Sequence, residues 1–243
     1  MNVPYSLPSY VFGPSWFHGF DSIIELIAVI ISFLLLFYSY RCYKLSSENR
    51  YLYFSTAFLS LTLAFISKIL GSLAIYLPKV KNSFAADIVV AAVKRISVSQ
   101  INAITFTFYI FFTILGIMIL FLIVSKLTWQ NKRVIALLTY FVFVAAWLGI
   151  IHYQLFYLTT TAMLALVTYS YYKHSKEIKS KKALMIAVAF GFLLVSHGLF
   201  IFSIYSKIIY VMAQVLQLAG FLFLLIPFVI IMSKKPKASK NGV

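Results

Sequence analysis

Residues 16–40 read WFHGFDSIIELIAVIISFLLLFYSY, and this stretch decides the class of the protein. From Ser22 to Tyr40 it runs for 19 residues with Glu25 as the single charged side chain. A helix that crosses the hydrocarbon of a bilayer needs about 20 mainly apolar residues. The stretch therefore predicts a transmembrane helix that carries a carboxylate near its beginning.

Similar apolar runs recur along the whole chain of 243 residues, of which 63% are hydrophobic. Soluble domains are nearer to about half. We expect a single all-α domain over 1–243, a polytopic membrane protein built as a helix bundle. Seven spans fit best, at 22–40, 51–77, 101–125, 134–151, 154–172, 183–205 and 208–232. Very short joints follow the fourth and sixth spans, so six spans are the alternative.

Three segments lie outside these spans. Residues 1–20 lack the positive n-region of a signal peptide, and we interpret them as an aromatic cap on the outer membrane surface. Residues 78–100 carry an apolar stripe at helical spacing, which predicts an outer interfacial helix or an extension of the third span. Residues 233–243 form a basic tail, which we expect in the cytoplasm.

The formal net charge of +16 arises mainly from loops that alternate across the membrane. One side receives fifteen basic residues: Arg41, Lys44, Arg50, Lys126, Lys132, Arg133, Lys173, Lys176, Lys179, Lys181, Lys182, Lys234, Lys235, Lys237 and Lys240. The other side receives five: Lys79, Lys81, Lys94, Arg95 and Lys207. Basic loops stay cytoplasmic, so the split predicts a cell-membrane protein with its N-terminus outside and its C-terminus inside. The charge then indicates anionic lipid headgroups, not nucleic acid, as its partner.

Short sequence matches suggest an internal repeat. Tyr38-Ser39-Tyr40 recurs as Tyr169-Ser170-Tyr171 at an offset of 131, and Ala57-Phe58 recurs as Ala189-Phe190 at an offset of 132. Gly116 would pair with Gly220 at an offset of 104, a shortfall close to the length of the extra segment 78–100. This pattern predicts two parallel three-helix units joined by the fourth span, an arrangement used by transporters. Chance matches are the alternative, because tyrosine and phenylalanine are abundant.

Ionisable groups inside a membrane are costly, so each one needs an explanation. At about 1.5 Å per residue, those of the predicted spans fall in the outer part of the bilayer. The candidate ligand-binding residues are Glu25, Lys68, His197, Gln214 and Gln217, with Asp21 and His18 at the outer mouth. Their shared level predicts a polar pocket that is open to the outside, with a Glu25–Lys68 ion pair and His197 nearby.

Each member also has a purely structural explanation. Ser22 and Glu25 match the S-x-x-E capping box, and Asp21 suits a helix N-terminus. Lys68 could extend to the headgroups. His197 could be a satisfied core histidine, and the two glutamines could bond a neighbouring helix.

The motifs argue against several specific chemistries. Histidine and carboxylate residues lack the H-x-x-x-H or H-E-x-x-H spacing of a metal site, and only His197 lies deep enough for haem ligation. We therefore expect no cofactor, and no catalytic set with diagnostic spacing is present. The topology resembles that of rhodopsins and G-protein-coupled receptors. However, the last span lacks the lysine that binds retinal, and Val124-Ser125-Lys126 stands where receptors carry D/E-R-Y.

Three functions remain open. The first is a receptor- or sensor-like module that binds a small ligand or ion outside and signals through a cytoplasmic or membrane partner. The second is a transporter of a small solute or ion, and the third is an intramembrane metal or haem redox protein. We favour the first, because the inner halves of the spans are almost free of charge, whereas a transporter needs polar groups on both sides of its site.

Overall fold

The computed structural model describes residues 14–17, 19–76, 98–125 and 132–233. These residues form one 3₁₀ turn and seven α-helices, with no β-strand among them. The helices are α1 (Phe20–Ser46), α2 (Asn49–Tyr76), α4 (Val98–Val124), α5 (Lys132–Ile151), α6 (Tyr153–Ile178), α7 (Lys181–Phe202) and α8 (Lys207–Ser233), and the 3₁₀ turn η2 spans Ser15–Phe17. The predicted spans match these helices to within three residues at most ends, whereas α1 and α6 each run six residues past the predicted end.

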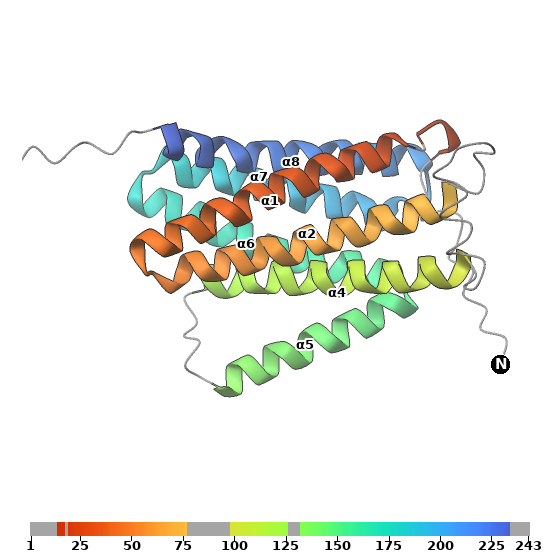
Figure 1. Cartoon of the computed structure of the whole chain (residues 1–243), viewed down its shortest axis with the longest axis horizontal. Helices are drawn as coiled ribbons and strands as arrows, with labels where there is room; N and C mark the ends of the chain where they lie inside the picture. The colour runs from red at the N-terminus through yellow and green to blue at the C-terminus, as the bar shows by residue number, and fades with distance from the viewer. Residues whose placement is uncertain (1–13, 18, 77–97, 126–131, 234–243) are drawn as a thin grey trace, which may run out of the picture.

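Successive helices run in opposite directions along one long axis (Figure 1). We call the end where α1, α4, α6 and α8 begin the proximal end, on the right of Figure 1. The opposite end, where α2, α5 and α7 begin, is the distal end. Most of segment 78–100 and of the basic tail 233–243 lie outside the described residues, although residues 98–100 belong to α4 and Ser233 ends α8.

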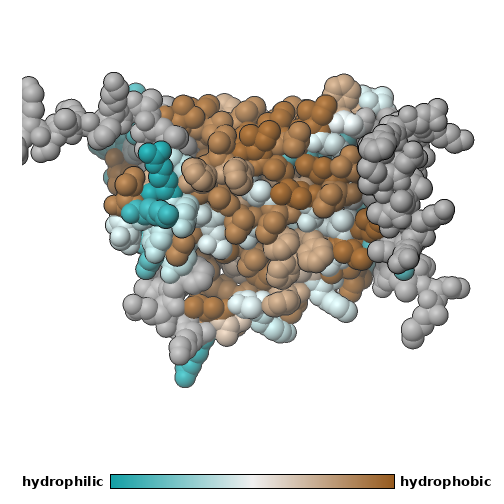
Figure 2. Space-filling view, in the orientation of Figure 1, coloured by the Kyte–Doolittle hydropathy of each residue, from teal (hydrophilic) through white to brown (hydrophobic). Residues whose placement is uncertain are grey.

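The outer surface of the bundle is strongly apolar. Large side chains such as Phe37, Leu137 and Trp147 are more than half exposed, which would be costly in water. Figure 2 shows this brown surface across the middle of the molecule, with teal side chains gathered at the distal end. Within the described residues, six helices are long and apolar enough to cross a membrane, so this is a membrane-embedded, multi-pass helical protein.

The one remaining helix of the seven, α6, is not among these six. It is 26 residues long, but hydroxyl side chains and a charged last turn lower its apolar content. Several of those hydroxyl groups are buried or donate to the helix's own carbonyls, as Thr159 does to Leu155 at 2.7 Å. Helix α6 therefore has the length of a span without the strongly apolar composition of the other six.

Close packing divides the bundle into neighbouring groups. Helix α2 packs extensively on α1 and α4, and α7 packs extensively on α6 and α8. Contacts between α1 and α8 and between α4 and α6 join the two groups, while α5 lies beside α4 and α6.

Two glycines permit closely similar helix crossings in these groups. A Cβ atom at Gly116 would lie 2.9 Å from Leu61 Cγ and 3.1 Å from the Ala57 carbonyl oxygen. A Cβ atom at Gly220 would lie 2.8 Å from Leu193 Cγ and 3.2 Å from the Ala189 carbonyl oxygen. Helix α4 therefore packs on α2, and α8 packs on α7, against the same kinds of atoms: a leucine side chain and an alanine carbonyl oxygen.

Candidate functional site

The centre of the candidate site is an ion pair between the first two long helices. Lys68 Nζ of α2 lies 2.7 Å from Glu25 Oε1 of α1, and the Glu25 side chain is 1% exposed. Both residues lie in the proximal part of their helices. The count of residues along the predicted spans had placed them at one common level. A buried ion pair of this kind has lost its hydration, so each charge depends on the other for compensation.

Aromatic rings enclose the ammonium group of this pair. Lys68 Nζ lies 5.4 Å from the ring centroid of Tyr109 on α4 and 5.7 Å from that of Phe200 on α7. Cations within about 6 Å of a ring centroid are attracted to the negative face of the ring. The Tyr109 side chain also interacts with that of Tyr157 on α6. Four helices thus contribute side chains around a charge that comes from α2.

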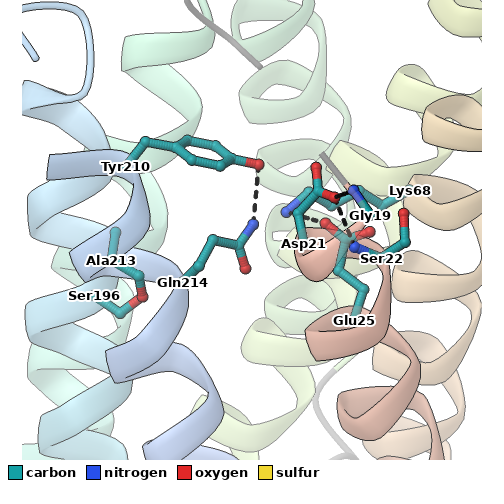
Figure 3. A network of polar contacts seen from close by, with 9 residues as sticks. All are labelled: Gly19, Asp21, Ser22, Glu25, Lys68, Ser196, Tyr210, Ala213 and Gln214. Carbon is teal, nitrogen blue, oxygen red and sulfur yellow. Dashed lines mark hydrogen bonds and ion pairs between the residues drawn. The ribbon is translucent and has the colours of Figure 1, made fainter. Parts of the chain in front are cut away.

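Helix α8 adds an amide beside the pair. Gln214 Nε2 donates to the Tyr210 hydroxyl at 3.0 Å, and the Gln214 side chain also interacts with the Glu25 carboxylate. Figure 3 shows Gln214 between Tyr210 and Glu25, with Lys68 on the far side of the carboxylate. Gln214 Oε1 is buried and has no hydrogen-bond partner among the described residues. The site therefore holds an amide oxygen that can still accept a hydrogen bond.

His197 of α7 lies at the same level of the bundle as Lys68, but an aromatic ring separates the two side chains. Its ring centroid is 6.2 Å from that of Phe200 and 5.9 Å from that of Tyr157. Its Nδ1 lies 3.0 Å from Thr160 Oγ1, and that hydroxyl also lies 3.0 Å from the Phe156 carbonyl oxygen. Either tautomer of His197 can make this hydrogen bond, because Nδ1 can donate to the Thr160 hydroxyl or accept from it.

Two small cavities adjoin these groups. One, of about 30 Å³, is lined by Lys68, the three tyrosines Tyr109, Tyr157 and Tyr210, and polar groups of α2 and α4. A water molecule needs about 10–15 Å³ of such volume, so this cavity accommodates water-sized species. The other, of about 20 Å³, is lined mainly by apolar side chains, with Tyr109, Thr113, His197 and Gln217 as its polar residues. The cavity beside Lys68 is therefore partly polar, and the second cavity, on the distal side of Lys68, is mainly apolar.

The predicted site residues do not all meet at one point. The structure brings together Glu25, Lys68 and Gln214, and it places His197 one ring away. Gln217 is buried beside the apolar cavity together with His197, and its Oε1 has no partner among the described residues. His18 lies outside the described residues.

The capping-box explanation of Ser22 and Glu25 is wrong. Helix α1 begins at Phe20 with Gly19 as its N-cap, so Ser22 already lies inside the first turn. Asp21 provides the helix-start chemistry, because its Oδ1 accepts hydrogen bonds from the Gly19 and Ser22 amides at 2.9 and 2.8 Å. Glu25 is therefore free of any capping role and turns to Lys68 instead.

Sequence reasoning missed Tyr109, Tyr157, Tyr210 and Thr160. The chain contains 17 tyrosines, most of which have no part in this layer, so residue type alone did not distinguish these three. The usable signal was depth, since the tyrosines fall at the level already inferred for Lys68 and His197. Thr160 gave no signal, because its role depends on which face of α6 turns toward α7.

The metal alternative finds no ligand set in the described part of the chain. No three residues among its His, Cys, Asp and Glu gather closely enough to hold an ion. Comparison of the chain with protein-family models, with curated proteins and with solved structures finds no match. The function is therefore argued from the geometry of the site itself.

Proposed function

We propose that this protein is a receptor- or sensor-like membrane module whose ligand engages the Glu25–Lys68 pair. The observation that carries the proposal is the pair itself, a 2.7 Å ion pair buried among aromatic rings near the proximal end. Purely structural ion pairs inside proteins are seldom more stabilising than apolar residues of similar volume. Ionisable residues in membrane spans more often mark ligand, ion or proton pathways.

The proposal orients the proximal end toward the outside. Described basic residues concentrate at the distal end, for example Arg41, Lys44, Lys173 and Lys181, whereas Lys207 begins α8 at the proximal end. Cytoplasmic loops carry such an excess of lysine and arginine. In this orientation all seven helices cross the membrane, and the Glu25–Lys68 pair lies a short distance below the outer surface.

The cavity beside Lys68 restricts what can bind without rearrangement. Its volume of about 30 Å³ is far below the roughly 300–1,000 Å³ of sites for drug-sized molecules. A water-sized ion fits directly, whereas a larger polar solute would have to separate α1 from α2 on entry. Either ligand would compete for one partner of the ion pair and so change how these two helices pack.

A signal would follow from that competition. If a ligand takes one charge, the other loses its partner in a low-dielectric layer, and α1 shifts relative to α2 to recover solvation. The described residues contain no output domain, so a separate cytoplasmic or membrane partner would detect the shift. The cavity below the site is lined mainly by apolar side chains, which supports this function, because a transporter would need polar groups on both sides of its site.

Hydrogen exchange on the purified protein in nanodiscs tests the proposal. The probes are sodium, chloride, acetate and glycine, compared at constant ionic strength. We expect at least one of them to change amide protection in the proximal halves of α1 and α2. The double variant Glu25→Gln/Lys68→Met should abolish the response while the protein stays folded. A response that is identical in the double variant would show that the pair is not the site.

A transporter is the second candidate, and one observation favours it. The matched contacts of Gly116 with Ala57 and of Gly220 with Ala189 support two parallel three-helix units, α1-α2-α4 and α6-α7-α8, with α5 between them. Parallel repeats of this kind occur in transporters. Uptake of labelled probe into proteoliposomes separates the candidates: flux that Glu25→Gln abolishes would establish transport and exclude a purely sensory role.

A further inference from the structure

A cavity lies at the distal end, at the opposite end of the bundle from the Glu25–Lys68 pair. It has a volume of about 380 Å³ and opens between α2, α4 and α6. That volume falls within the range of about 300–1,000 Å³ typical of ligand sites. The argument for its occupant is independent of the function proposed above, because the two sites share no residue.

The rim of this cavity carries an excess of cationic and hydrogen-bonding groups. Arg50 comes from the first turn of α2, while Lys173 and His174 come from the last turns of α6, and Glu177 is the single carboxylate among the lining residues. Arg50 contacts Glu48 at 3.8 Å, but both side chains are more than half exposed, so this contact neutralises it weakly. Arginine and lysine side chains together suit a phosphate group, which accepts several charge-assisted hydrogen bonds.

The floor of the same cavity is apolar. Phe54 of α2, Ile123 and Val124 of α4 and the Tyr171 ring of α6 line it, and Tyr171 stacks on Phe190 at 5.3 Å between ring centroids. A free inorganic anion would leave these surfaces uncovered. A ligand with a phosphate at one end and an apolar portion at the other would contact both the rim and the floor.

We propose that this cavity binds a phosphate-bearing amphiphile, the head of an anionic phospholipid of the surrounding leaflet. The cavity lies among the ends of membrane helices, at the level where lipid headgroups sit. Basic pockets between transmembrane helices bind such headgroups in this position. The shared chemistry is a phosphate ester, and the apolar floor distinguishes the lipid from a soluble phosphate compound.

The test uses the full-length protein, delipidated in a mild detergent, with thermal unfolding as the readout. The probes are short-chain phosphatidylglycerol, short-chain phosphatidylcholine, glycerol phosphate and inorganic phosphate. Of these four probes, we expect only phosphatidylglycerol to give a saturable rise in Tm. Arg50→Gln/Lys173→Gln should raise its half-saturation concentration by roughly tenfold, because two charge-assisted contacts are lost. Lys44→Gln/Lys181→Gln removes equal charge at the distal end outside the cavity and should leave binding unchanged.

A second variant covers the case in which the charge variant fails to fold. Ser170→Phe fills the cavity while keeping every basic residue, and it should abolish the Tm rise. Equal effects of phosphatidylcholine, equal losses in the Lys44/Lys181 control, or undiminished binding by Ser170→Phe would each overturn the proposal. Saturation by glycerol phosphate or inorganic phosphate as tight as that by the lipid would overturn the lipid assignment, because the apolar floor would then contribute nothing.

Discussion

Glu25 and Lys68 are 43 residues apart in the sequence, yet their side chains meet at 2.7 Å between α1 and α2. The contact between Arg50 and Glu48, in contrast, is largely exposed. Burial makes the two residues mutually dependent, because neither charge can recover water without opening the helix interface.

This dependence predicts a non-additive response to mutation. Lys68→Met should destabilise the protein by about 3–5 kcal/mol, because it leaves the Glu25 carboxylate buried and uncompensated. Glu25→Leu/Lys68→Met should recover most of that loss, because it removes both charges. Chemical denaturation in detergent measures the effect, with Lys207→Met as the control at an exposed lysine. Equal loss in the single and double variants would contradict the mutual dependence of the pair.

The glycine contacts predict a second pattern. Gly116→Ala and Gly220→Ala should each cost about 1–3 kcal/mol, because the new Cβ atom would overlap Leu61 or Leu193. Gly191 and Gly198 are matched controls, since a Cβ atom at either would meet nothing within 4 Å. Alanine there should be neutral or stabilising by up to about 1 kcal/mol, because it favours helix. Thermal unfolding of the four variants, measured side by side, checks this order of stabilities. A larger loss of stability at Gly191 than at Gly116 or Gly220 would refute it.

The contact between Thr160 and His197 predicts a third effect. Thr160→Val removes the hydrogen-bond partner of His197 Nδ1 and should cost about 1–3 kcal/mol, because a buried polar atom then loses its partner. Adding His197→Leu should recover part of that loss. Thr159→Val is the control, since the Thr159 hydroxyl donates only to its own helix. If Thr159→Val and Thr160→Val proved equally destabilising, the hydrogen bond to His197 would have no special weight.

The proposed orientation predicts which turns face the outside of the cell. In a Cys42→Ser background, Tyr205→Cys places a thiol in the proximal turn between α7 and α8, and Lys179→Cys places one in the distal turn after α6. Both native side chains are exposed. A membrane-impermeant maleimide added to intact cells should label position 205 and not position 179. Labelling of position 179 alone would reverse the orientation.

Much of the candidate site was predictable because depth in a membrane helix follows from residue count. A rise of about 1.5 Å per residue placed Glu25, Lys68 and His197 at one level before any helix was packed. The same count could not decide whether Glu25 capped its own helix. The S-x-x-E pattern fits a capping box only if Ser22 is the N-cap, and the actual N-cap is Gly19.

The sequence by itself determined the membrane class, the approximate helix bounds and the distribution of charge, because these depend on local composition and on the length of each apolar run. Only the tertiary structure decided which polar groups meet, because that depends on how each helix is rotated about its axis. Close contacts such as Gly116 on Leu61 help to fix how α4 lies on α2. In the packed bundle Glu25 faces Lys68, and the hydroxyl of Thr160 faces His197. The distal cavity likewise had no sequence signal, since it exists only where α2, α4 and α6 leave space between their ends.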